Sequence, residues 1–187
     1  MPVVAFKVGM VGSVENIAAI AEVVADYPDI PLILDPVLAS GRGDELASED
    51  MISAMTELLL PQTTLITPNS QEARRLARFL PQEEEDGGGD DPDLAECARR
   101  ILRMGCEYVL ITGTHENAPQ VVNTLYNEQG VVRSDTWERL PGTYHGSGCT
   151  LASAIAATLA NGLDLPEAVR AAQEYTWQSL AAGFRPG

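Results

Sequence analysis

The chain has 187 residues, of which 45% are hydrophobic, and this size suits one domain with a substantial core. A formal net charge of −15 argues against a nucleic-acid-binding surface, because such a surface needs clustered lysine and arginine. No apolar run approaches the ~20 residues that cross a membrane, and no secretory signal is recognisable, so we expect no membrane partner.

Cysteine and histidine are scarce. The three cysteines, Cys97, Cys106 and Cys149, are odd in number and show no C-x-x-C spacing. This pattern is typical of a reduced, cytoplasmic protein without a disulfide framework. With two histidines and no paired spacing of metal ligands, the sequence does not predict a structural zinc site.

The first part of the chain alternates between short apolar runs and amphipathic segments. These predict strands at 3–8, 31–34 and 63–66, and helices at about 14–26, at 48–60 and from Asn69 onward. Ser13 is placed to cap the first of these helices. Asn69, with Glu72 three residues later, forms a capping-box pattern at the start of the third.

An acidic, glycine-rich run at 81–93 interrupts this alternation, and we expect a solvated flexible loop there. Beyond it the pattern predicts a helix at 94–104, a strand at 108–112, hairpin arms at 120–126 and 131–135, and helices at 147–161 and 166–182. The hairpin is expected to turn at 127–130. Gly162 is placed to end the first of the last two helices.

This order of elements predicts an α/β fold with a largely parallel sheet and helices on both faces. We take the whole chain, 1–187, as a single domain. In sheets of this kind, ligands bind outside the carboxyl ends of the strands. The candidate site residues therefore follow the predicted strands: Met10, Asp35, Asn69, Glu72, Thr112, Gly113 and the loop at Gly146.

A glycine-rich turn at 143–150 leads into the helix predicted at 147–161. The first N–H groups of a helix have no partner within it and carry partial positive charge, which makes an anion site. Gly146 and Gly148 let the backbone approach that anion closely. Cys149 lies in or next to the first turn, where the pKa of a thiol is expected to fall.

An anion site beside a proton acceptor suits transfer of a phosphoryl group to a hydroxyl. The alternative for the same turn is a close-packed junction between loop and helix, with a buried and inert cysteine. The turn alone does not decide between these two interpretations, because Gly-x-Gly before a helix is a common pattern.

Two carboxylates and an amide follow neighbouring strands. Asp35 stands between a strand and Pro36, and a carboxylate there can hold Mg²⁺ directly or through water. With Glu72 and Asn69 after the next strand, the arrangement would suit Mg²⁺ bound to a triphosphate. Each residue also has a structural alternative, Asp35 as a turn residue and the other two as halves of the capping box.

Several motifs share one order along the chain: Lys7-x-Gly9-Met10, Asp35-Pro36-Val37, Thr67-Pro68-Asn69-x-x-Glu72-Ala73, Val109-Leu110-Ile111-Thr112-Gly113 and His145-Gly146-Ser147-Gly148-Cys149-Thr150. With them the sequence resembles the hydroxymethylpyrimidine/phosphomethylpyrimidine kinases of thiamine biosynthesis, in the ribokinase-like superfamily. The resemblance covers nearly the whole chain outside the acidic run. It implies a three-layer sandwich, ATP and Mg²⁺ as cofactors, and a homodimer.

The resemblance implies ATP-dependent phosphorylation of 4-amino-5-hydroxymethyl-2-methylpyrimidine and then of its monophosphate. Cys149 would take the proton from the acceptor hydroxyl. The backbone N–H groups of Gly146, Ser147 and Gly148 would stabilise charge on the transferred phosphoryl group.

Other roles implied by the resemblance fall on the strand ends. Asp35 and Glu72 would serve Mg²⁺ and phosphate, with Asn69 beside them. Met10 and Val37 would line the pyrimidine pocket. By the same resemblance, Thr112 and Gly113 would lie near the ATP phosphates, and the hairpin near adenine.

Two features depart from the resemblance. Thr112 stands where this branch often has lysine. Family members usually begin well upstream, with a first strand, a substrate loop and a small lid, so we expect the N-terminal part of the family fold to be missing. Two alternatives stay open: a pyridoxal kinase, which shares the fold, and a non-catalytic ligand-binding or assembly domain that keeps the anion site.

Overall fold

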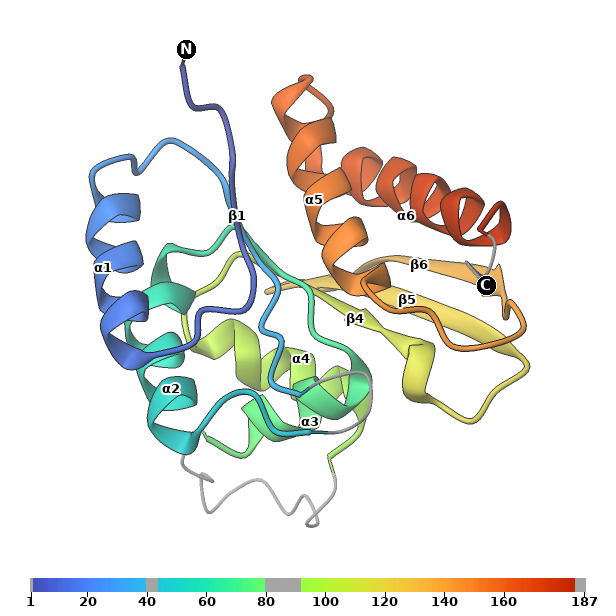
Figure 1. Cartoon of the computed structure of the whole chain (residues 1–187), viewed down its shortest axis with the longest axis horizontal. Helices are drawn as coiled ribbons and strands as arrows, with labels where there is room; N and C mark the ends of the chain where they lie inside the picture. The colour runs from blue at the N-terminus through green and yellow to red at the C-terminus, as the bar shows by residue number, and fades with distance from the viewer. Residues whose placement is uncertain (1, 40–43, 80–91, 184–187) are drawn as a thin grey trace.

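The computed structural model of the chain describes residues 2–39, 44–79 and 92–183 (Figure 1). In this part of the chain one sheet lies between two layers of helices, which confirms the predicted three-layer α/β fold. The strands, in their order across the sheet, are β1 (Phe6–Val8), β2 (Leu32–Leu34), β3 (Leu65–Ile66), β4 (Tyr108–Thr112), β5 (Gln120–Asn127) and β6 (Gly130–Glu138).

Strands β1 to β4 pair in parallel, and β5 and β6 continue the sheet in antiparallel pairing. The predicted hairpin is confirmed, with Asn127 opposite Gly130 at its turn. Because the four parallel strands follow one another in both sequence and space, right-handed crossovers place their connecting helices on one face. Their carboxyl ends meet at one edge of the sheet.

The α-helices are α1 (Val14–Ala25), α2 (Glu49–Ala54), α3 (Ser70–Ala77), α4 (Leu94–Arg103), α5 (Ser147–Ala160) and α6 (Leu165–Ala181). Figure 1 shows α1 to α4 on one face of the sheet and α5 with α6 on the other. Within the described residues, no helix is long and apolar enough to cross a bilayer.

The alternating side chains of the strands separate two cores. Leu34 and Ile66 face the core under α1 to α4, whereas their neighbours Ile33 and Leu65 face the core under α5 and α6. Alternation of this kind is what a strand buried on both faces requires. It fixes the register of the central strands, because a slip by one residue would exchange the two cores.

The predicted helix at 48–60 is only partly an α-helix. After α2 the chain forms a π-helical turn at Met55–Leu59 and a 3₁₀ turn at Leu60–Gln62. Pro61 has no N–H and so cannot extend an α-helix. In this wider turn Leu58 is exposed and Leu59 is buried. A uniform α-helical repeat did not predict this difference between the two leucines.

The predicted helix ends are confirmed. Ser13 caps α1, and Asn69 with Glu72 forms the capping box of α3. Gly162 follows α5 with a positive φ of 90° and donates its N–H to the carbonyl of Leu159. Most of the acidic run predicted as a flexible loop at 81–93 lies outside the described residues. Asp93 at its end caps α4.

Candidate functional site

A cavity of about 1190 Å³ opens at the carboxyl edge of the parallel strands. Its walls come from the loops after β2, β3 and β4, the β5–β6 hairpin, the N-terminus of α5 and one side of α6. Most predicted site residues line it: Asp35, Val37, Asn69, Glu72, Thr112, Gly146, Ser147, Gly148 and Cys149. The topology thus brings together residues that are widely spaced in the sequence.

The N-terminus of α5 at the cavity has no side-chain cap. Its N-cap residue is Gly146, with a φ of +80°, which makes no side-chain cap within the part of the chain that the structure describes. The other five α-helices each begin with a capping side chain, from Ser13, Ser48, Asn69, Asp93 or Asp164. Open space surrounds Gly146 and Gly148, because an added Cβ on either would meet no atom within 4 Å. These N–H groups are therefore arranged to receive an anion.

Cys149 is exposed at the cavity, so the alternative of a buried, inert cysteine is wrong for this residue. The expected lowering of its thiol pKa is also wrong. Partial burial raises the pKa of Cys149, and the negative charge of Asp35 and its hydrogen bond to the thiol raise it further, against a lowering effect of Lys7. Burial and a nearby carboxylate both disfavour the charged thiolate.

Asp35 is buried at the end of β2 and forms an ion pair with Lys7 of the neighbouring strand β1, at 3.4 Å. The ammonium group of Lys7 reaches this position by lying over Gly9, where a Cβ would stand 2.6 Å from Nζ. Glycine at position 9 thus leaves room for the ammonium group of Lys7 in this position. Asp35 therefore faces both a cation and the Cys149 thiol.

Glu72 joins two loops at the floor of the cavity. One carboxylate oxygen accepts the N–H of Leu38 and the other accepts the N–H of Asn69, each at 3.0 Å. Burial raises the pKa of Glu72, the two backbone hydrogen bonds lower it, and the charge of Asp35 raises it, with a net upward shift. The capping role is confirmed, and a role in Mg²⁺ binding stays a prediction.

Val37 follows Asp35 and Pro36 with a φ of +39°, a conformation that a β-branched side chain rarely adopts. Its side chain lines the cavity. Met10, by contrast, is 66% exposed and lines a separate groove between β1 and α1. Within the described residues, the two predicted pyrimidine contacts are therefore not brought together.

Thr112 and Gly113 end β4 beside the cavity. Thr112 lines it and forms an isolated parallel bridge with Asn69. Gly113 donates its N–H to the side-chain oxygen of Asn123 at 3.1 Å, and a Cβ at Gly113 would stand 2.3 Å from the carbonyl oxygen of Val122. Gly113 is thus required for close approach to β5, and its N–H is used within the protein.

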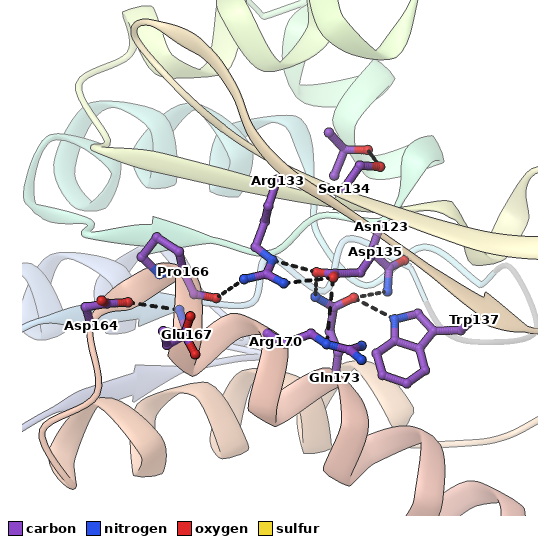
Figure 2. A network of polar contacts seen from close by, with 11 residues as sticks. Asn123, Arg133, Ser134, Asp135, Trp137, Asp164, Pro166, Glu167, Arg170 and Gln173 are labelled. Atoms are coloured by element: carbon purple, nitrogen blue, oxygen red, sulfur yellow. Dashed lines mark hydrogen bonds and ion pairs between the residues drawn. The ribbon is translucent and has the colours of Figure 1, made fainter.

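A polar network on the hairpin and α6 forms another wall, and sequence reasoning missed it. Figure 2 shows the side chain of Gln173 between Asn123, Asp135 and Trp137. Arg133 completes it with a two-point contact to Asp135. The available signal was weak: two polar residues in hairpin strands and one glutamine in an amphipathic helix.

The sequence profile of the family described as phosphomethylpyrimidine kinase matches residues 1–187. The chain belongs to the phosphomethylpyrimidine kinase family. It is 35% identical over 186 residues to the hydroxymethylpyrimidine/phosphomethylpyrimidine kinase of Rhizobium meliloti. The matched residues make up 99% of this chain and 67% of that protein.

Two solved structures superpose on this fold. The phosphomethylpyrimidine kinase of Clostridium difficile superposes with a TM-score of 0.75 at 28% identity, over 96% of this chain and 70% of that one. The pyridoxal kinase from Staphylococcus aureus in complex with AMP-PCP and pyridoxal gives 0.81 at 28% identity, over 98% of this chain and 64% of that one. The chain thus spans about two thirds of the length of these members.

Proposed function

We propose that the chain belongs to an enzyme that transfers the terminal phosphoryl group of ATP to hydroxymethylpyrimidine and then to its monophosphate, in thiamine biosynthesis. One arrangement carries the proposal: the uncapped N-terminus of α5 lies beside Cys149 in the cavity that Asp35 also lines. Binding of AMP-PCP by the related Staphylococcus aureus pyridoxal kinase supports a nucleotide in this cavity.

In the proposed reaction, the acceptor oxygen forms a bond to the γ-phosphorus as the bond to the ADP oxygen breaks. The hydroxyl proton passes to the Cys149 thiolate. Because Cys149 is exposed at the cavity, its thiol forms the thiolate by losing a proton to solvent, a form that burial and Asp35 oppose and Lys7 favours. The N–H groups of Gly146, Ser147 and Gly148 stabilise the charge on the moving phosphoryl group.

Mg²⁺ fits the site as a partner of the nucleotide and not as a resident ion. Among the residues that the structure describes, no group of three or more His, Cys, Asp or Glu side chains is placed to hold a metal. In kinase sites, however, Mg²⁺ takes one or two protein carboxylates and completes its shell with phosphate and water. Asp35 would hold it, with Glu72 nearby, and the ion would neutralise phosphate charge.

The test is ATP-dependent phosphate transfer to hydroxymethylpyrimidine and to its monophosphate, measured as ADP release. We expect Cys149→Ala to lower kcat by about 100-fold or more, the usual contribution of a general base. Ser153→Ala, an exposed change in the same helix, is the control and should leave kcat unchanged. Equal turnover by Cys149→Ala and the unchanged protein would remove Cys149 from the mechanism.

Pyridoxal is the second candidate substrate. The Staphylococcus aureus pyridoxal kinase superposes more closely than the Clostridium difficile phosphomethylpyrimidine kinase, with TM-scores of 0.81 and 0.75. Competition between pyridoxal and hydroxymethylpyrimidine for phosphorylation separates the two. Calorimetric binding of magnesium-ATP or of the pyrimidine phosphate without turnover would instead favour the non-catalytic binding or assembly domain.

We also propose that residues 1–187 act as one domain in a cytoplasmic homodimer. All three cysteines are free thiols, which supports a reducing compartment. Among the described residues, strand β1 pairs with β2 alone, and an unpaired sheet edge can bind a further strand or a second copy. Sedimentation at two protein concentrations tests the dimer.

A further inference from the structure

The network between the hairpin and α6 is buried and directional. Gln173 is 3% exposed and Asn123 is 7% exposed. The side-chain oxygen of Gln173 accepts from Asn123 Nδ2 and from Trp137 Nε1, both at 2.9 Å, while its Nε2 donates to Asp135 at 2.9 Å (Figure 2). Each step of the network is therefore a short side-chain contact between different elements.

Two end groups fix the direction of every bond. The indole N–H of Trp137 can only donate, and the ionised carboxylate of Asp135 can only accept, so the amide of Gln173 has one possible orientation. Burial raises the pKa of Asp135, but hydrogen bonds from Arg133 and Gln173 and the charges of Arg133 and Arg170 outweigh it, and the net shift is downward. Asp135 is therefore ionised at neutral pH and holds that orientation.

The fixed hydrogen-bond orientation extends through Asn123 to Gly113, at the end of β4. Because Asn123 Nδ2 must donate to Gln173, its side-chain oxygen is left to accept the N–H of Gly113. The peptide that follows Thr112 is linked in this way, through Asn123, to α6, which packs on the hairpin. If Asn123 lost this orientation, the buried Gly113 N–H would lose its acceptor, which proteins rarely tolerate.

We propose that Gln173 is a positioning residue, which through Asn123 fixes the Thr112–Gly113 corner where the nucleotide phosphates bind. This inference rests on the proposed function, because it needs a nucleotide in the cavity that Thr112 lines. The Cys149 end of the cavity belongs to α5 and is not part of the network. Gln173 thus acts on nucleotide affinity and not on the chemical step.

The experiment compares four forms of the full chain: unchanged, Gln173→Met, Gln173→Glu and Thr124→Ala. ADP affinity is measured by calorimetry and by tryptophan fluorescence, because the only two tryptophans, Trp137 and Trp177, line the cavity. Thr124→Ala is the matched control, since it removes the exposed contact with Ser134 between the same two strands. Thermal unfolding verifies that each form is folded.

Gln173→Met keeps the length of the side chain and removes all its hydrogen bonds. We expect the Kd for ADP and the KM for ATP to rise roughly tenfold, because all three hydrogen bonds that orient Asn123 and Gln173 are lost, with kcat changed less than about twofold. Thr124→Ala should change neither. An unchanged Kd in Gln173→Met, or an equal rise in the control, would overturn the proposal.

Gln173→Glu provides a readout that simple destabilisation would not give. Its new carboxyl group would face Asp135, Arg133 and Arg170, the charged groups of this network. When protonated, that group can donate to Asp135 and still accept from Asn123 and Trp137, so ADP affinity should match the unchanged protein at low pH. When ionised it would repel Asp135, so affinity should fall as pH rises. A pH profile parallel to that of the unchanged protein contradicts the proposal.

Two further outcomes complete the test. Should Gln173→Met fail to fold, Trp137→Phe removes the indole donor to Gln173 and keeps an aromatic ring beside Trp177 and Arg170, with ADP affinity then measured by calorimetry. It should still raise the Kd for ADP by roughly two- to fivefold, since one neutral hydrogen bond is lost, and no rise would overturn the proposal. Absence of ADP binding to the unchanged protein would instead refute the proposed function, and this inference with it.

Discussion

The ammonium group of Lys7 lies 3.4 Å from the carboxylate of Asp35, and both charges act on the same thiol. Asp35 raises the pKa of Cys149 and Lys7 lowers it. The thiolate is the nucleophilic and basic form of cysteine. Together with burial, which makes the largest contribution, these two residues therefore set how much of Cys149 is thiolate at a given pH.

Asp35→Asn should lower the pKa of Cys149, because it removes the nearest negative charge. Alkylation by iodoacetamide, which follows the thiolate, should then reach half its maximal rate at a lower pH. Lys7→Met should move the same profile to higher pH. Cys97 and Cys106 do not interfere in the folded protein, because burial raises their pKa to about 11 and about 12. Shifts of the same sign in both variants would contradict this electrostatic account.

Gly148→Ala should separate folding from activity. A Cβ at this position meets no atom within 4 Å, and Gly148 lies in the first turn of α5, so stability should hold or rise by about 0.5–1 kcal/mol. In the proposed reaction, however, the new methyl group would crowd the phosphoryl group, and loss of such stabilisation lowers kcat by about 100-fold or more.

Gly146→Ala is the matched control for the effect of a new methyl group on stability. Gly146 has a φ of +80°, and an alanine there would cost about 1–2 kcal/mol of stability although space is open. Thermal unfolding and ADP release measure the two effects separately. Full activity in Gly148→Ala would show that the phosphoryl group does not approach this turn.

Glu72→Gln should destabilise the protein although it removes a buried charge. Both oxygens of Glu72 accept backbone N–H groups, from Leu38 and Asn69, and an amide supplies only one acceptor. One buried N–H would face an NH₂ group, at a cost of about 1–3 kcal/mol. Urea unfolding measures this, with the exposed Glu22→Gln as a control of equal charge change. Unchanged or greater stability would mean that relief of the buried charge dominates.

The sequence predicted well what depends on neighbouring residues. Strands, caps and the capping box at Asn69 follow from local patterns and from the requirement to pair backbone groups. The predicted direction of the Cys149 pKa shift was wrong, because the shift depends on burial and on Asp35, and both arise only when distant parts of the chain fold together. The network at Gln173 was missed for the same reason. Its bonds join two hairpin strands to α6, and no local period marks residues that meet only after folding.

Asp135 should give the protein a specific sensitivity to acid. Its pKa is lower in the folded than in the unfolded chain, so its contribution to stability is complete above the ordinary aspartate pKa of about 4 and is lost as pH falls through the lower folded value. Asp135→Asn should lower the free energy of unfolding in urea at pH 7 by about 1–3 kcal/mol, the range for charged hydrogen bonds, and should flatten its decline below pH 4. Glu174→Gln, an exposed change of equal charge on α6, controls for net charge. Parallel acid profiles in all three proteins would mean that Asp135 contributes no pH-dependent stability.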